Sequence, residues 1–476
     1  MPKTFSTARK TVIVCLASWI TILVCMCASG FSTGAHVIRD EFGLIELEGM
    51  EKESGHSNEW VWGTFGGLGL YLLGFAFGPM LLAPASEVWG RRPVYLVSWF
   101  LFCLCQIPIA LAHNFSLVAA FRFFSGFVGS APLSNVAGTI TDLIPTAKSG
   151  YAIALYALAS VIGPALGSVM GGYPVEKLGW RWLYWIYAIV FGAHIIVIWA
   201  FMPETRENIV LKVKVRHIRK TYPDVASNCY AASEITTISG KQLLKASLTR
   251  PYIFLFTEPI TYLSGAVNAF ALGMIFLSNE AFPLIFGRGN GGHLWTSYGA
   301  INLTFLSYVV GSLLAFACQP LQQRAYMRSV AASPNGIASP EVRWWFSRFA
   351  VPLLPIGLQL AAWTSDADTF WIVPLIGFAM FGFAFFSVIV SIFAYMMDSY
   401  KSFSASAMSG VVLSRNLVCA FLPLAARPMF KTLGNNWALF TLSLVSCLLV
   451  PIPWFLYYKG KAIRQKSPFC RQHMED

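Results

Sequence analysis

The sequence predicts an all-α membrane protein whose twelve transmembrane helices form two pseudo-symmetric six-helix bundles. Three observations support this fold class. Of the 476 residues, 56% are hydrophobic and only 12% are charged, whereas a soluble domain is about 25% charged. The apolar residues occur in blocks of about 20, the length at which a helix crosses about 30 Å of hydrocarbon. The lysines and arginines gather in connectors between these blocks, which is typical of loops on the cytoplasmic side of a membrane.

Composition also excludes several classes of function. The net charge of +12 would suit a nucleic-acid partner, but the basic residues lie in the membrane connectors, so we expect no such partner. The ten cysteines show neither metal-site spacing nor a paired framework. We expect the Cys25–Cys27 and Cys103–Cys105 pairs to be small packing residues rather than ligands. The chain has no nucleotide-binding loop of the Gly-Lys-Ser/Thr type, so ATP is not the expected energy source. We therefore expect no enzyme, no catalytic residue, no cofactor and no metal.

The N-terminal bundle is predicted over residues 11–203, after a basic cytoplasmic tail of residues 1–10. Its apolar blocks are residues 11–34, 60–82, 93–112, 115–141, 149–173 and 182–202. The tail and first block would also fit a signal peptide, but the block is long for one and many similar blocks follow. The acidic loop of residues 36–59 fits the outer side. A glycosylation sequon begins at Asn114, and we expect it to lie too near the membrane for use.

The C-terminal bundle is predicted over residues 251–458, between a basic cytoplasmic central loop (204–250) and a cytoplasmic tail (459–476). Its apolar blocks are residues 252–280, 294–318, 345–364, 370–397, 404–427 and 436–458. Placing both termini inside puts roughly 25 lysines and arginines on the cytoplasmic side and roughly seven outside. An odd number of spans would remove this asymmetry, so six plus six helices are predicted.

The densest group of charges separates the second and third blocks. Residues 83–92 read Ala-Pro-Ala-Ser-Glu-Val-Trp-Gly-Arg-Arg. This turn resembles the signature loop between the second and third helices of the major facilitator superfamily, usually Gly-x-Leu-Ala-Asp-Arg-x-Gly-Arg-Lys. Here Glu stands in place of Asp, and Ala in place of the first Gly and the Leu. The Ser-Glu-x-x-Gly-Arg-Arg-Pro-Val form is common in the fungal drug:proton antiporter branch.

Further segments resemble this branch over nearly the whole chain. They include residues 121–130, 159–172, 203–207, 256–260, 279–283, 355–365, 395–400 and 415–430. The resemblance implies the major facilitator fold and a monomeric secondary active transporter in a lipid bilayer. Such a protein exports small organic compounds, such as drugs or secondary metabolites, in exchange for protons by alternating access. The plasma membrane is the expected location, with the vacuolar membrane as the alternative.

Two other functions remain open at this point. One is transport of a specific metabolite, such as a polyamine or an organic acid. The other is a non-transporting receptor built on a transporter scaffold. Two arginines and one clearly buried acid inside the predicted spans argue against a polycation as the substrate.

The charged turn has two interpretations. It can simply orient the neighbouring helices, because adjacent arginines favour the cytoplasmic side. The resemblance instead favours a cytoplasmic gate made of Glu87, Gly90, Arg91, Arg92 and Asp142. In that gate Glu87 approaches the start of the eleventh helix near Ser404, where free N–H groups favour a carboxylate. Arg91 or Arg92 pairs with Asp142.

Polar residues inside the predicted spans are candidates for the substrate or proton path: Arg122, Glu258, Asn268 and Arg415. A buried cation needs a partner, so each arginine either bonds to a helix carbonyl or belongs to the path. Glu258 is either a proton carrier or a cap near the start of the seventh helix. Asn268 contributes either a packing hydrogen bond or a substrate contact. Glu280 is expected to be solvated at the outer end of that helix.

The fifth block contains a glycine-rich motif that resembles the fifth-helix motif of antiporters. Its members are Gly163, Pro164, Gly167 and Gly171. The proline removes a backbone donor and can bend the helix, and the glycines let a neighbouring helix approach closely. Packing alone explains this pattern, while the resemblance implies a tight seal against ion leakage.

Overall fold

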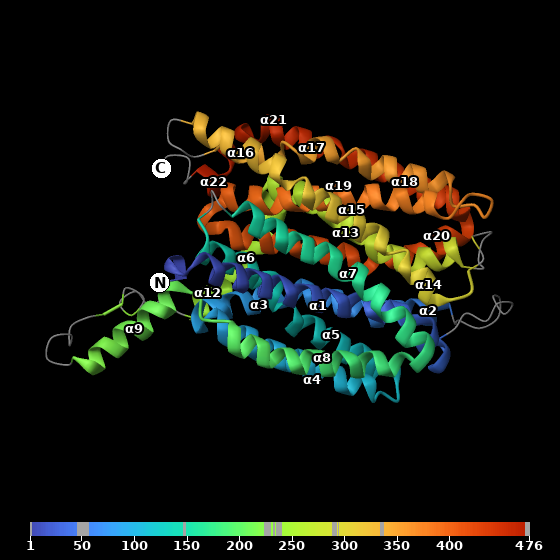
Figure 1. Ribbon diagram of the computed structural model, residues 1–476, viewed down its shortest axis with the longest axis horizontal. Helices are drawn as coiled ribbons and strands as arrows, with labels where there is room; N and C mark the ends of the chain where they lie inside the picture. Colours follow the sequence, from blue (N-terminus) through green and yellow to red (C-terminus); the bar gives the residue numbers. More distant parts are fainter. Residues whose placement is uncertain are drawn as a thin grey trace.

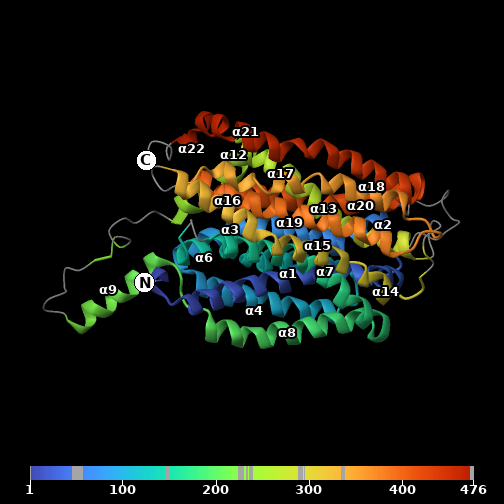
Figure 2. The same cartoon turned by 45° about the horizontal axis from the view of Figure 1, so that its top comes forward.

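The computed structural model describes residues 2–44, 57–145, 149–222, 230–231, 234, 240–287, 293, 295–333 and 338–471. The regular structure in these ranges is entirely helical, which confirms the predicted all-α fold. The long helices run roughly parallel to one another, and the two halves of the chain lie side by side (Figure 1). The start of α1, α9 and α22 lie at one end of the molecule, which we call the terminal end (Figures 1 and 2).

The N-terminal half begins with the long helix α1 (Thr7–Glu41). It continues through α2 (Ser57–Thr64), the π-helical segment η2 (Phe65–Gly69), α3 (Leu70–Trp89), α4 (Arg91–Ala110), α5 (Phe115–Gly129), α6 (Ala131–Leu143), α7 (Gly150–Leu178) and α8 (Trp180–Phe201). The fourth predicted span is divided between α5 and α6 at Ser130, two residues before a proline. Proline lacks the backbone donor that a continuous helix uses, which accounts for the break.

The C-terminal half begins with α12 (Gly240–Thr257), after α9 (Glu207–Thr221), which projects from the terminal end (Figure 1). It contains α13 (Pro259–Phe286), α14 (Tyr298–Leu303), α15 (Leu306–Ala317), α16 (Gln319–Ala332), α17 (Ser347–Ala350), α18 (Leu353–Trp363), α19 (Ile372–Tyr400), α20 (Ser404–Leu449), α21 (Pro451–Lys466) and α22 (Pro468–Arg471). Short 3-10 turns are η1 (Pro2–Thr4), η4 (Pro340–Trp344) and η5 (Lys401–Phe403). Helix α9 has no buried residue, as its basic composition suggests.

Eleven helical runs of the described residues are long and apolar enough to cross a membrane. Each of the twelve predicted blocks overlaps one of these runs, and the last run (Ser404–Lys466, 63 residues) holds two of the blocks. Within this run the helical geometry is interrupted at Gly434, whose φ is 76° and ψ is 170°. A positive φ is readily adopted by glycine, so the eleventh and twelfth predicted spans are joined there without a longer loop.

The interface between the halves depends on two helices. Helix α20 packs along α13 in its own half and also contacts α3 of the other half. Helix α7 packs along α1 in its own half and also contacts α14, α15 and α19 of the other. The buried aliphatic and aromatic side chains form one large cluster that draws on both halves. Any relative movement of the halves must therefore change the contacts of α7 and α20.

Candidate functional site

Charged side chains connect α3, α4 and α6 at the terminal end. Arg91 begins α4, and its Nε lies 2.8 Å from Oδ2 of Asp142 near the end of α6. The Arg91 guanidinium also donates to Ser86 Oγ at 3.4 Å. Arg206 Nη1 lies 3.8 Å from the other oxygen of Asp142. The side chains of Arg91 and Asp142 are only 6% and 14% exposed, so water and salt screen this pair less than a surface ion pair.

Glu204 organises the turn between α3 and α4, although sequence reasoning assigned it no role. Its carboxylate accepts hydrogen bonds from the backbone N–H groups of Arg91 (3.0 Å) and Arg92 (3.1 Å). These are free donors at the start of α4, where a negative charge is stabilising. Gly90 has a φ of 102°, and a Cβ at this position would collide with the Glu204 carboxylate. Only glycine therefore fits at position 90, because it allows both the backbone turn and the close approach of Glu204. The Arg92 side chain points elsewhere and donates to the Trp199 carbonyl at 2.8 Å.

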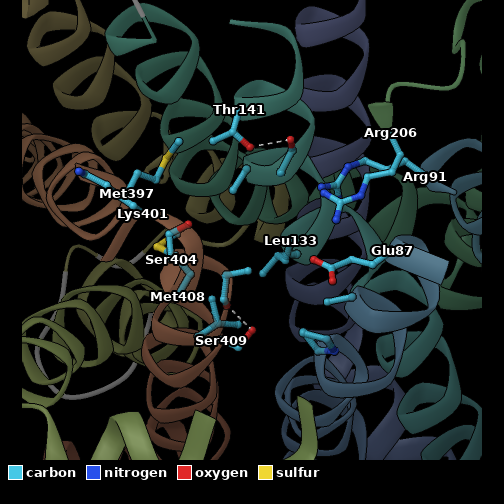
Figure 3. Close-up of a pocket in the computed structure, with 16 residues that line it drawn as sticks. Glu87, Arg91, Leu133, Thr141, Arg206, Met397, Lys401, Ser404, Met408 and Ser409 are labelled. Atoms are coloured by element: carbon cyan, nitrogen blue, oxygen red, sulfur yellow. Dashed lines mark hydrogen bonds between the residues drawn. The ribbon is translucent and has the colours of Figure 1, made fainter. Parts of the chain in front are cut away.

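A cavity of about 340 Å³ lies beside this cluster, between the two halves. Glu87 of α3 and Arg206, directly before α9, line it on one side, and Lys401 of η5 and Ser404 of α20 line it on the other (Figure 3). Among the described residues, Glu87 forms no hydrogen bond or ion pair. In this conformation Glu87 and the start of α20 are therefore separated by the cavity, rather than joined as the sequence-based gate has them.

An ion pair joins the two halves at the opposite end. Arg39 Nη1 of α1 lies 3.7 Å from Glu280 Oε1 of α13, and the two side chains are 7% and 9% exposed. Arg39 also donates to Thr64 Oγ1 at 3.0 Å. The expectation that Glu280 is solvated is therefore wrong, because a partner from the other half covers it. The sequence contained the two charges but not their pairing across halves.

Further hydrogen bonds close the same end. Ser168 Oγ of α7 lies 2.7 Å from Oδ1 of Asn279 on α13. The Glu176 carboxylate of α7 accepts from Ser297 Oγ and from the Gly299 backbone N–H, both at 2.9 Å. These contacts fix α7 against α13 and the start of α14. The halves are thus bound together at this end and separated by a cavity at the terminal end.

Arg122 is fully buried, and its guanidinium is well satisfied. Its nitrogens donate to the carbonyls of Gly67 (2.7 Å), Cys27 (2.8 Å) and Ala28 (2.9 Å). The guanidinium carbon also lies 4.3 Å from the centroid of the Tyr71 ring. The structure therefore places Arg122 among helix carbonyls of α1 and η2, the first of its two interpretations, and a role in coupling stays a prediction.

Arg415 is equally buried but differently surrounded. It is 2% exposed on α20, and no described residue forms a hydrogen bond or ion pair with it. Its neighbour Asn416, 1% exposed, has neither amide atom paired among the described residues. The same is true of Asn268 on α13, which is fully buried. These unsatisfied groups lie close to the interface between the halves, where Arg415 and Asn416 line a small cavity.

Glu258 lies at a helix break rather than inside a helix. It is the residue between α12 and α13, directly before Pro259, and only 1% exposed. Its carboxylate accepts hydrogen bonds from Tyr400 Oη and Ser467 Oγ, both at 2.9 Å. The hydroxyl of Ser467 also accepts from the Cys470 backbone N–H at 3.1 Å. Glu258 thus attaches the C-terminal segment to the start of α13, and its backbone carbonyl begins that helix.

Cys470 of α22 is fully buried beside this hydrogen-bond network. Burial raises the pKa of its thiol to about 11. A thiol with a raised pKa carries little thiolate at neutral pH. Cys470 is therefore unreactive at neutral pH and serves packing.

The glycine motif of α7 packs directly on α1. A Cβ at Gly163 would lie 2.5 Å from the Cβ of Cys25, and one at Gly167 would collide with the Met26 carbonyl. A Cβ at Gly171 would lie 2.5 Å from Thr33 Oγ1. The glycines therefore allow two backbones to touch. Pro164 is buried in the same helix and lines the small central cavity.

Asn114 caps α5 through its side chain. Its Oδ1 accepts a hydrogen bond from the Leu117 backbone N–H at 2.8 Å. This contact is a standard helix cap. The absence of glycosylation at this sequon stays a prediction.

Two helical halves with charged cavities along their shared interface are the architecture of a secondary transporter. A family model described as Major Facilitator Superfamily matches residues 17–423. The chain belongs to this superfamily. It is a multi-pass membrane transporter and not an enzyme.

Curated relatives agree over most of the chain. The efflux pump FUB11 of Gibberella fujikuroi is 33% identical over 434 residues, which cover 91% of this chain and 74% of that protein. The efflux pump atB of Aspergillus terreus is 35% identical over 397 residues, 82% of each chain. The multidrug transporter TPO1_2 of Candida glabrata is 31% identical over 465 residues, 97% of this chain and 76% of that protein.

Solved structures show the same fold. The proton:xylose symporter XylE, bound to 6-bromo-6-deoxy-D-glucose, superposes with a TM-score of 0.65 over 95% of this chain and 96% of that one. The sequence identity is 13%. At this identity the likeness concerns the fold alone.

Proposed function

We propose that the protein exports small organic compounds in exchange for protons by alternating access. The observation that carries the proposal is the asymmetry between the two ends. An ion pair and hydrogen bonds join the halves at one end, while a cavity of about 340 Å³ separates them at the terminal end. The positive charge of the connectors assigns the terminal end to the cytoplasm. The structure then corresponds to a form that receives substrate from the cytoplasm.

The gate follows from the same asymmetry. Glu87 lies across the cavity from the start of α20, where free N–H groups favour a carboxylate. When the halves approach at this end, Glu87 caps α20, and the Arg91–Asp142 pair fixes α4 against α6. Breaking Arg39–Glu280 opens the opposite end. Glu258 is the proposed proton carrier, because its carboxylate is buried, accepts hydrogen bonds from two hydroxyl groups and forms no ion pair among the described residues.

The direction of transport is supported by the names of the curated relatives, which are efflux pumps and a multidrug transporter. Plasma membrane is the proposed location, with the vacuolar membrane as the alternative, and the monomer is the proposed working unit. The buried arginines Arg122 and Arg415 continue to argue against a polycation as substrate.

The test uses inside-out membrane vesicles with an acidic interior, so that the terminal end faces the medium. Three probes share one ring and differ in charge: naphthalene-2-sulfonate, 2-naphthamide and trimethyl(2-naphthyl)ammonium. We expect uptake of at least one probe above that of vesicles without the protein, and loss of this uptake when a protonophore collapses the gradient. Uptake of all three probes at the level of empty vesicles would contradict the proposed function.

A further inference from the structure

Three cavities follow α20 from one end of the protein to the other. The cavity at the terminal end is lined by Met408 and Val412 of this helix. The central cavity is lined by Arg415 and Asn416, one helical turn further along. A third cavity at the opposite end is lined by Arg427 of the same helix. These cavities trace the interface between the halves, where a substrate must pass under the proposed function.

Positive charges dominate the lining of these cavities. The six cationic side chains are Arg91, Arg206, Lys401, Arg415, Arg39 and Arg427. The two carboxylates are Glu87 and Glu280. The path keeps an excess of three positive charges even when Asp142, which pairs with Arg91, is counted. Such a lining raises the local concentration of anions and lowers that of cations.

The clearest evidence comes from Arg415, which lines the central cavity. A buried cation in a membrane protein is costly unless it has a partner. Arg122 meets this need with three carbonyls, whereas Arg415 has no hydrogen-bond partner among the described residues. A guanidinium binds a carboxylate or sulfonate through parallel hydrogen bonds. A bound carboxylate or sulfonate would supply the partner that Arg415 lacks among the described residues.

The surroundings of Arg415 define the rest of such a ligand. Unpaired amide groups of Asn416 and Asn268 supply further hydrogen bonds, with Asn268 one turn before the cavity residue Leu272. Phe75 and Phe276 line the same cavity with apolar rings. Its volume of about 10 Å³ suits one water molecule. Binding therefore requires the halves to separate at the centre, as alternating access demands.

We propose that the transported substrate is a small organic anion, with one carboxylate or sulfonate group bound by Arg415 and an apolar body held by the rings. This inference rests on the proposed function, since it assigns a substrate class to the same path. It also narrows that function, because neutral drugs and polyamines would leave Arg415 without a partner.

Binding to the purified full chain tests this assignment without transport. We measure dissociation constants of the three naphthalene probes by calorimetry in detergent at pH 7.5. Because hydrogen bonds to charged groups contribute about 1.5–3 kcal/mol, naphthalene-2-sulfonate should bind about 10- to 100-fold more tightly than 2-naphthamide. In Arg415→Gln this ratio should fall to about one under the same reasoning, and Arg415→Lys should retain part of it.

The control variant is Arg181→Gln, an arginine that is 36% exposed and pairs with Glu41 inside the N-terminal half, away from the three cavities. It should keep the wild-type ratio. If the wild-type protein binds the amide or the ammonium probe as tightly as the sulfonate, the inference is overturned. This comparison uses the wild type alone, so it does not depend on the folding of any variant.

The two proposals fail separately. Proton-driven uptake of the amide or ammonium probe without Arg415-dependent sulfonate binding would leave the transport function standing and overturn the anion assignment. Arg415-dependent sulfonate binding without uptake of any probe would support the anion site and contradict the proposed transport. Absence of sulfonate binding by the wild type overturns the anion assignment whatever the vesicles show.

Discussion

Replacing Glu280 by glutamine removes the ion pair that joins the halves opposite the terminal end. At 3.7 Å and an effective dielectric constant of about 20, two unit charges attract by roughly 4 kcal/mol. Desolvation of the two buried groups offsets part of this attraction, so we assign about 2 kcal/mol to the pair. If the pair exists only while this end is closed, its loss shifts the equilibrium toward opening by about 30-fold, since 1.36 kcal/mol is a factor of ten.

The assay measures access to the cavity at this end. Ser32 lines the same cavity as Arg39 and Glu280, so a cysteine at position 32 reports its opening. A membrane-impermeant maleimide is added from the outer side, and its reaction rate is compared with that of protein lacking the added cysteine. Ser32→Cys with Glu280→Gln should react about 30-fold faster than Ser32→Cys alone.

Glu41→Gln is the matched control for this experiment. Glu41 ends α1 at the same end of the molecule, but its ion pair with Arg181 at 2.7 Å stays inside the N-terminal half. Its loss should leave the maleimide rate unchanged. A rate for Glu280→Gln within twofold of the parent, or an equal increase in the control, would refute the assignment of Glu280 to the closed end.

Three further changes test other parts of the structure. Gly167→Leu should destabilise the protein by about 1–3 kcal/mol through overpacking against α1, which would lower its melting temperature in detergent. The control Gly192→Ala should not lower it, because a Cβ at position 192 would meet its nearest neighbour at 3.8 Å. Equal melting temperatures for the two variants would contradict this packing. The hydrogen bond from Arg219 lowers the pKa of Glu234, so this contact is fully formed above the pKa of the unfolded state and is lost as the pH falls through the pKa of the folded state. Proteolysis of α9 should therefore accelerate in acid for the wild type but not for Glu234→Gln. Parallel pH profiles for the two proteins would count against the contact. Glu258→Gln should keep exchange of probe between vesicle and medium but lose acceleration by a proton gradient, and undiminished acceleration would exclude Glu258 as the proton carrier.

The fold was predictable because the membrane imposes length and hydrophobicity on each span. Blocks of about 20 apolar residues have few alternatives to a spanning helix, and each of the twelve blocks overlaps one of the eleven helical runs. The closeness of Arg91 and Asp142 was also accessible, since both were placed at helix ends on the same side. What the sequence lacked was the choice between Arg91 and Arg92, because the turn at Gly90 decides which arginine points toward α6.

The missed features all depend on contacts between distant segments. Glu280 looked solvated because its partner Arg39 lies on another half of the chain. Glu258 looked helical because hydropathy does not detect the break before Pro259, although proline often begins a helix. Arg122 and Arg415 looked alike in sequence, since a buried arginine is satisfied or unsatisfied only by its neighbours in space.

A second arginine–aspartate pair lies at the terminal end, in the C-terminal half of the chain. Comparing it with Arg91–Asp142 indicates which of the two pairs suits the proposed gate. Arg343 Nε of η4 lies 2.7 Å from Asp398 Oδ2 of α19, with side chains 3% and 6% exposed. Next to it, Glu341 accepts two hydrogen bonds from Arg464 at 2.8 and 2.9 Å. A buried, doubly satisfied group of charges resists separation, because breaking it strands a charge at about 3–5 kcal/mol. The Arg91–Asp142 pair is more exposed and borders the cavity, so under the proposed gate it is the pair whose rearrangement costs less.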